Sequence, residues 1–167
     1  LTGNIRNAIQ YINTEYIFVI QHDLEFVKNF EIEKVIQDMK NDPKLKHVRF
    51  NQRKNTQVRV DAYPKEGRWM YGKKLTSINY DYIRTPGWSD QNHLCRTDYY
   101  HNLILKECTD GCFMENIIDR RQKTEEIHNI YGTYIFGIVN DGQMINHLNG
   151  RHYILDICNN NFTINTN

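Results

Sequence analysis

A run of five apolar and aromatic residues, Tyr16 to Ile20, is followed at once by the polar segment 21–25. A short continuous run of this kind is typical of a β-strand that is buried on both faces, as in a sheet covered by helices. In open α/β sheets, ligands bind beyond the carboxyl ends of the strands. The run therefore predicts an α/β fold and places residues 21–25 at a ligand-binding edge of its sheet.

Hydrophobic periodicity elsewhere predicts the helices and strands that accompany such a sheet. Apolar residues at helical spacing predict amphipathic helices over 3–13 and 32–39. Residues 140–143 contain an Asp-Gly pair, which predicts a turn that joins two strands, 133–139 and 144–148, into a hairpin. The other predicted elements are strands at 47–50, 58–60 and 75–82, a loop at 85–88, and helices over 97–107 and 112–118.

Composition fits one globular domain that spans residues 1–167. The chain is 40% apolar and 25% charged, which is enough to bury a core. Lys and Arg number 21 against 20 Asp and Glu, so no strong field favours nucleic acid or a membrane surface as a partner. No apolar run approaches the roughly 20 residues that cross a bilayer, so no transmembrane segment is predicted.

Four cysteines are present, at positions 95, 108, 112 and 158. Because nothing else in the sequence indicates secretion, reduced thiols and a cytoplasmic location are expected, and any membrane association would come from parts outside this chain. A zinc site on Cys108 and Cys112 with His101 or His128 is an alternative, but the spacing does not match a zinc knuckle. Packing of the two thiols around a turn at Asp110-Gly111 is the favoured interpretation.

Asp23 and Glu25 are the strongest candidates for chemistry. Residues i and i+2 of an extended segment point the same way, so the two carboxylates are predicted to converge. Oxygen ligands suit Mg²⁺ or Mn²⁺, and such an ion can hold a diphosphate and neutralise the charge that develops as it leaves. A solvated acidic loop is the alternative interpretation.

Two segments, 3–8 and 16–25, resemble the central part of family 2 glycosyltransferases of the GT-A fold. The resemblance implies that Arg6 and Asn7 open a helix on the donor side, and that His22 stands where an acidic residue is often found. It also implies that Asp23 and Glu25 take the place of the acidic Asp-x-Asp motif that binds the metal and the donor diphosphate.

The resemblance continues downstream. Gly87 and Trp88 begin a segment similar to the acceptor-side glycine loop of the family, and Trp88 could stack on a sugar ring there. Glu115 takes the place of the family's general base, with Asp90 as the second choice because it lies in the polar loop beside Trp88. Near the end of the chain, His147 matches a histidine that the fold often supplies to the metal or diphosphate.

Together these matches imply a GT-A-like mixed sheet flanked by helices that moves a sugar from a nucleotide-sugar donor to a glycan hydroxyl. The implied reaction depends on Mn²⁺ or Mg²⁺ and is a direct displacement that inverts the anomeric carbon. The family begins with a strand-helix-strand unit that binds the nucleotide base, and that unit is expected before Leu1, outside this sequence. The fold is therefore expected to be truncated at its N-terminus.

Two other functions remain open. A metal-dependent nucleotidyltransferase also uses paired carboxylates at a strand end, and it would release pyrophosphate from a nucleoside triphosphate. A non-catalytic carbohydrate-binding remnant of the fold would keep its ligand when Asp23 is replaced by Ala.

Overall fold

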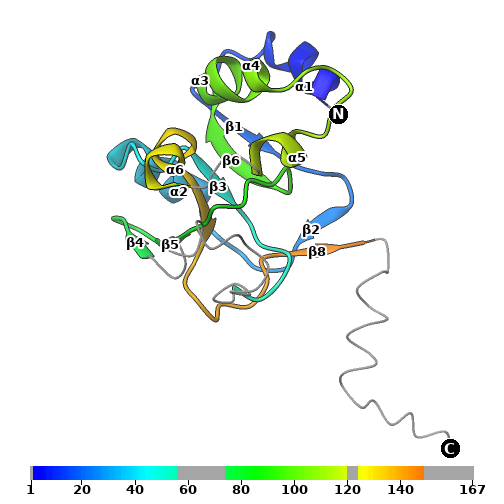
Figure 1. Ribbon diagram of the computed structural model, residues 1–167. Helices are drawn as coiled ribbons and strands as arrows, with labels where there is room; N and C mark the ends of the chain where they lie inside the picture. Colours follow the sequence, from blue (N-terminus) through cyan, green and yellow to red (C-terminus); the bar gives the residue numbers. More distant parts are fainter. Residues whose placement is uncertain (1, 56–73, 120–123, 149–167) are drawn as a thin grey trace, which may run out of the picture.

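A computed structural model describes residues 2–55, 74–119 and 124–148 of the chain. They form a mixed α/β fold with a six-stranded sheet, β1-β6-β3-β7-β5-β4, and a two-stranded sheet, β2-β8 (Figure 1). The strands are β1 (Tyr16–Val19), β2 (Leu24–Phe26), β3 (His47–Arg49), β4 (Lys74–Thr76), β5 (Asp81–Arg84), β6 (His93–Arg96), β7 (Thr133–Phe136) and β8 (Ile145–His147). The helices are α1 (Thr2–Ile9), α2 (Ile32–Asn41), α3 (Thr97–Tyr99), the π-helix η2 (Tyr100–Ile104), α4 (Leu105–Glu107), α5 (Met114–Ile118) and α6 (Glu125–Tyr131). None of these described helices is long and apolar enough to cross a membrane.

Strand β1 confirms the predicted strand and defines the direction of the sheet. It pairs antiparallel with β6, β6 pairs antiparallel with β3, and β3 pairs parallel with β7. Strands β1, β3 and β7 therefore run the same way, and their carboxyl ends lie along one edge. The segments 20–25, 50–55 and 137–141 follow these three ends, at the edge where open α/β sheets bind ligands.

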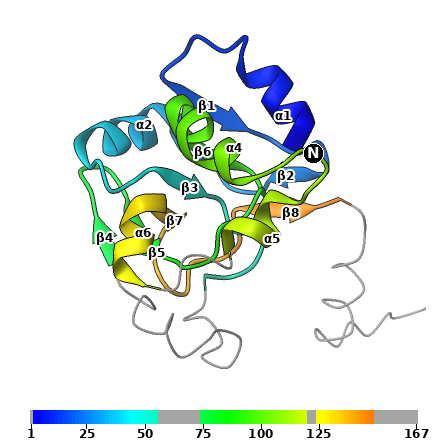
Figure 2. The same ribbon diagram turned by 45° about the horizontal axis from the view of Figure 1, so that its top comes forward.

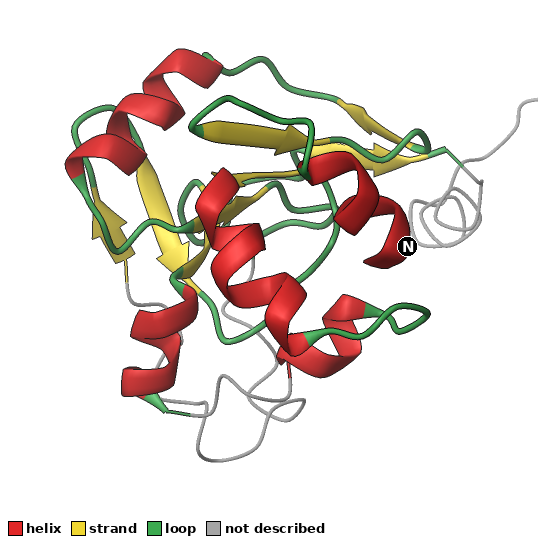
Figure 3. Cartoon of the chain, turned by 90° about the horizontal axis from the view of Figure 1, so that it is seen from above, coloured by secondary structure: helices red, strands yellow, loops and turns green. Residues whose placement is uncertain are grey.

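Helices cover both faces of the sheet (Figure 3). On one face, Ile17, Cys95 and Tyr100 belong to a core that includes residues of α1, η2, α4, α5 and α6. On the other face, Val48 and Leu94 belong to a core that includes residues of α2 and the small sheet. Because side chains alternate along a strand, the neighbours Leu94 and Cys95 enter different cores. The apolar run itself is less buried than predicted: β1 is an edge strand in which Ile17 is buried and the other three residues are half-buried, and Ile20 is 57% exposed.

The predicted hairpin of 133–139 with 144–148 is wrong. Strand β7 pairs with β3 and β5, whereas β8 pairs with β2 in the separate small sheet. The chain leaves the sheet at Gly137, whose φ is 91°, and the Asp141 carboxylate accepts a hydrogen bond from Ile138 N at 2.8 Å. The turn here is formed by Val139 and Asn140 and is closed by a hydrogen bond from Asp141 N to the Ile138 carbonyl at 3.1 Å, so the Asp-Gly pair follows the turn. The pairing of β7 with β3 and of β8 with β2 takes the place of the local hairpin.

Other boundaries also differ from the predictions. Strand β6 was not predicted, since His93-Leu94-Cys95-Arg96 mixes polar and apolar residues although its first three side chains are buried. Helix α6 was not predicted because its acidic start looks like a solvated charge run. Thr124 caps that start by accepting a hydrogen bond from Ile127 N, and Gly132 ends the helix with a φ of 55°. The predicted strand 58–60 lies outside the described residues.

Asp38 connects α2 to strand β5 and to the loop that precedes it. Its fully buried carboxylate accepts hydrogen bonds from Asn79 N, Asn79 Nδ2 and Tyr80 N at 2.8–3.0 Å, and from the Tyr82 hydroxyl at 2.7 Å. A buried charge is stable only when its oxygens are bonded in this way. The loop before β5 is therefore held in place by one side chain of α2.

We predict that Asp38→Ala lowers the free energy of unfolding by about 3 kcal/mol, since it leaves several buried donors without an acceptor. Tyr82→Phe, which removes one hydroxyl, should cost about 1 kcal/mol. Chemical denaturation measures both values, and Glu33→Ala on the exposed face of α2 is the matched control, expected to change stability by less than about 0.5 kcal/mol. An Asp38→Ala variant as stable as the control would contradict this role.

Candidate functional site

The turn after β1 is held to β6 by the side-chain amide of Asn92. Gln21 N donates to Asn92 Oδ1 at 2.8 Å, and Asn92 Nδ2 donates to the Leu24 carbonyl at 2.9 Å. Asn92 is fully buried, and its own carbonyl accepts from Phe50 N at 3.0 Å. One residue therefore positions the turn that carries Asp23 against the ends of β3 and β6.

Asp23 and His147 lie together at one end of the small sheet. Asp23 Oδ2 is 3.4 Å from His147 Nε2, and both side chains are partly open to solvent. The Asp23 carbonyl also accepts from Leu148 N at 2.8 Å, which extends the β2-β8 ladder by one bond. A carboxylate oxygen and an imidazole nitrogen are both ligands that Mn²⁺ accepts, so the pair fits as part of a metal site.

Glu25 does not join this pair. It lies opposite Asn146 in the ladder, and Asn146 Nδ2 donates to Glu25 Oε1 at 3.2 Å. Over residues 2–55, 74–119 and 124–148, no three His, Cys, Asp or Glu side chains are grouped closely enough to hold a metal ion. The prediction assumed an extended segment from Asp23 to Glu25, but Asp23 lies in a turn and β2 begins at Leu24, so the i, i+2 rule does not apply.

Two other carboxylates, those of Asp90 and Glu115, lie beside the turn that carries Asp23. Gln21 Nε2 donates to the Asp90 carbonyl at 2.8 Å. Burial raises the pKa of Asp90 above its ordinary value. Partial burial likewise raises the pKa of Glu115, and the charge of Asp90 raises it further. A hydrogen bond with Ser89 and the charge of Arg49 lower it. Glu115 remains exposed to solvent.

Helix α5 supplies Glu115 and lies on the side of the molecule that also carries β2 and β8 (Figures 1 and 2). Phe113 stands before the helix with extended backbone, and Glu115 lies in its first turn. The sequence prediction of a helix in this region, with Glu115 near its start, is therefore confirmed. The charge of Asp90, the other suggested base, contributes to the raised pKa of Glu115.

Trp88 is placed differently from the prediction. It is 1% exposed, and its ring lies 5.3 Å from that of His47 and 6.0 Å from that of His93. Gly87, just before it, is also buried. Stacking of Trp88 on a sugar is therefore wrong for this structure, because the ring packs into the core beneath the loop.

The buried His93 supports the loop that carries Asp90. Its Nδ1 donates to the Gln91 carbonyl at 2.6 Å, and its Nε2 accepts from the Tyr100 hydroxyl at 2.8 Å. The ring of His47 lies 4.5 Å away. Tyr100 begins the π-helix, so the position of this loop depends on the local π geometry of that helix.

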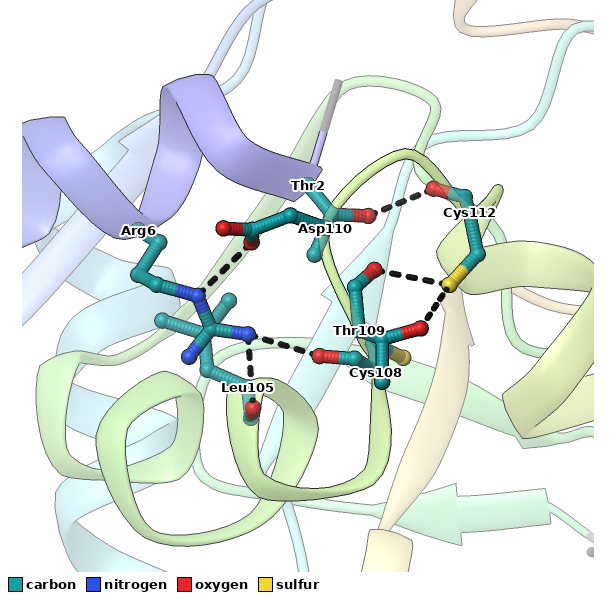
Figure 4. Close-up of polar contacts among 7 residues, drawn as sticks. All are labelled: Thr2, Arg6, Leu105, Cys108, Thr109, Asp110 and Cys112. Atoms are coloured by element: carbon teal, nitrogen blue, oxygen red, sulfur yellow. Dashed lines mark hydrogen bonds and ion pairs between the residues drawn. The ribbon is translucent and has the colours of Figure 1, made fainter.

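Arg6 is also placed differently from its donor-binding prediction. Its Nε contacts Asp110 Oδ1 at 2.8 Å, and its Nη2 donates to the carbonyls of Leu105 and Cys108 at 3.1 and 2.7 Å (Figure 4). The guanidinium therefore binds the end of α4 to α1, because a helix C-terminus attracts a cation. The other two predicted donor residues, Asn7 and His22, have exposed side chains.

The two described cysteines of the zinc alternative lie around the predicted turn. Gly111 has a φ of 85°, and Cys112 Sγ donates to the Thr109 carbonyl at 2.7 Å (Figure 4). Cys108 is buried, and neither Cys108 nor Cys112 is part of a disulfide. The packing interpretation is therefore confirmed, while the cytoplasmic location stays a prediction.

Comparison of the chain with protein-family models, with curated protein sequences and with solved structures found no match. The function of this sheet edge must therefore follow from its own chemistry. Two features define it: the Asp23–His147 contact, and the carboxylates Asp90 and Glu115 with their raised pKa values.

We predict that Asn92→Asp destabilises the chain by about 2 kcal/mol, because it replaces the donor to Leu24 with an acceptor. Hydrogen exchange at Gln21 N should rise with it, since the turn loses one of its two anchors. Asn13→Asp, at an exposed position, is the matched control. Unchanged exchange at Gln21 in the Asn92 variant would show that the turn is held by other contacts.

Acid is predicted to destabilise the fold through its buried histidines. Burial lowers the pKa of His93 and of His128 to about 4, against an ordinary 6.5. As the pH falls below 6.5, these two histidines therefore bind protons in the unfolded chain before they do so in the folded chain. Stability should be unaffected by these groups above about pH 6.5 and fall between there and pH 4, by about 1.4 kcal/mol per pH unit for each proton.

Denaturation curves at pH 7, 6 and 5 measure this fall. His128→Gln removes one titrating group, so its stability should decline less steeply than that of the unmodified chain. Equal slopes for the two proteins would show that His128 is not part of the effect.

Proposed function

We propose that this chain is the metal-binding and acceptor-side part of a nucleotide-sugar glycosyltransferase with a GT-A-like fold. The observation that carries the proposal is the Asp23–His147 contact, at 3.4 Å, beside the turn that Gln21 and Asn92 hold against the Asp90 loop. The residues proposed to bind the metal, Asp23 and His147, and the loop that carries Asp90 come from segments far apart in the sequence and lie at one edge of the sheet. The resemblance of segments 3–8 and 16–25 to family 2 glycosyltransferases agrees with this arrangement.

Asp23 and His147 are the residues that would hold Mn²⁺ or Mg²⁺. Mg²⁺ is usually bound through one or two carboxylates, with substrate phosphates and water completing the set, and Asp23 would supply one such carboxylate. When bound, the ion would neutralise the charge that develops on a departing diphosphate. Glu25 is left out of this set, because it bonds Asn146.

Glu115 is the proposed base, and Asp90 is the residue that tunes it. A carboxylate with a raised pKa accepts a proton more readily than an ordinary one, while Arg49 favours its ionised form. Glu115 would take the proton of an acceptor hydroxyl as the hydroxyl oxygen forms its bond to the anomeric carbon. The bond from that carbon to the diphosphate breaks in the same step, and attack from the opposite side inverts the configuration.

The test separates donor binding from chemistry. Calorimetry would measure binding of UDP-glucose, UDP-galactose, UDP-N-acetylglucosamine and GDP-mannose with and without Mn²⁺, and nucleoside diphosphate release would report transfer to water. We predict that Asp23→Asn abolishes the Mn²⁺-dependent part of binding. Glu115→Gln should bind the donor within about twofold and slow release about 100-fold, the usual scale of a general base.

Glu126→Gln, an exposed carboxylate on α6, is the matched control and should behave as the unmodified chain. Donor binding that survives Asp23→Asn would end the proposal, as would Mn²⁺-independent binding of every donor. Pyrophosphate release from a nucleoside triphosphate would instead identify a nucleotidyltransferase.

A further inference from the structure

A pocket lies at the end of the small sheet opposite to the Asp23–His147 contact. Its volume is about 450 Å³, within the range of about 300–1,000 Å³ typical of small-molecule sites. Its lining includes Lys28, Phe30, Tyr80, Asp81, Phe136 and Asp141. These residues follow β2, flank the start of β5 and end β7, so the pocket opens at the same sheet edge as the Asp23–His147 pair.

The wall of the pocket is aromatic. The ring of Phe136 lies 4.9 Å from that of Tyr80 and 5.8 Å from that of Phe30. Phe30 and Tyr80 are partly exposed and Phe136 is 9% exposed, so the cluster presents some aromatic surface to the pocket. Aromatic faces carry partial negative charge and attract the weakly positive C–H groups of a ligand.

Polar groups of both kinds surround this wall. Lys28 Nζ donates to the Gly142 carbonyl at 3.1 Å and has further N–H groups. Asp81 accepts a hydrogen bond from Lys74 through Oδ2 at 3.0 Å, and its carboxylate also bonds the Thr76 side chain. The lining also includes the Asp141 carboxylate and the exposed amide of Asn29. A ligand with groups that both donate and accept would satisfy this rim.

The balance of charge selects among ligands. The pocket has two carboxylates, Asp81 and Asp141, against one ammonium, Lys28, and Lys74 pairs with Asp81, so no excess of positive charge favours a phosphate or other anion. A purely apolar ligand would offer no hydrogen-bond partner to the polar groups of Lys28 and Asn29 in the lining. A neutral sugar ring fits both features, because one of its faces exposes C–H groups and its rim carries hydroxyls.

We propose that this pocket binds a neutral sugar ring of a glycan. The β2-β8 ladder joins it to the Asp23–His147 end, since Phe26 pairs with Ile145 and Val27 N donates to the Met144 carbonyl. Lys28 is five positions after Asp23, which limits the span between their Cα atoms to about 18 Å. Its role as a subsite for a remote ring of the acceptor rests on the proposed function, whereas sugar binding itself does not.

The experiment uses the isotopically labelled chain and four disaccharides as probes: maltose, cellobiose, lactose and N,N′-diacetylchitobiose. At least one should shift the amide signals of residues 28–30, 79–81 and 136–138. Ile138→Trp adds bulk at the lining and should weaken that binding by about tenfold or more, equal to about 1.4 kcal/mol. Ile78→Trp, at an exposed isoleucine that is not among the lining residues, is the matched control and should bind within about twofold of the unmodified chain.

Asp81→Asn serves as a second variant that preserves side-chain size, and it should also weaken binding. Absence of shifts with all four sugars would overturn the proposal, as would equal affinity in Ile138→Trp and Ile78→Trp. Asp23→Asn should leave disaccharide binding unchanged. Sugar binding that persists in a chain without Mn²⁺-dependent donor binding would therefore uphold the pocket and reject only the transferase.

Discussion

The amide of Asn92 is the constraint on which the arrangement of this sheet edge depends. It bonds Gln21 N and the Leu24 carbonyl, while its own carbonyl accepts from Phe50 N. The segments that follow β1 and β3 and the residue that precedes β6 are thereby fixed relative to one another. Because Asn92 is fully buried, water does not compete for these bonds.

Two groups of charged side chains and one pocket lie along this edge. Asp23 and His147 face solvent at one end of the β2-β8 ladder, and Asp90 and Glu115 lie beside the turn. At the other end of the ladder, Phe136 and its aromatic neighbours line the pocket. The parallel direction of β1, β3 and β7 explains why groups so distant in sequence lie along one side of the sheet.

The sequence was informative where one local pattern determines the outcome. The apolar run predicts β1, and helical spacing predicts α2, because burial of those residues needs no knowledge of distant partners. The pairing of β8 with β2 could not be predicted, since the Asp-Gly turn signal is local and the competing strand lies over 100 residues away. Arg6 and Trp88 were assigned to ligands for the same reason: their true partners, Asp110 and the His47 ring, become neighbours only on folding.

Manganese-induced broadening of amide signals tests the central claim most directly. Mn²⁺ would be titrated into the labelled chain at substoichiometric amounts, since a paramagnetic ion removes signals near its binding site. The account predicts loss first at residues 22–24 and 146–148, and no such loss in Asp23→Asn. Broadening centred elsewhere, or identical in the variant, would contradict the assignment of Asp23 and His147 to one metal site.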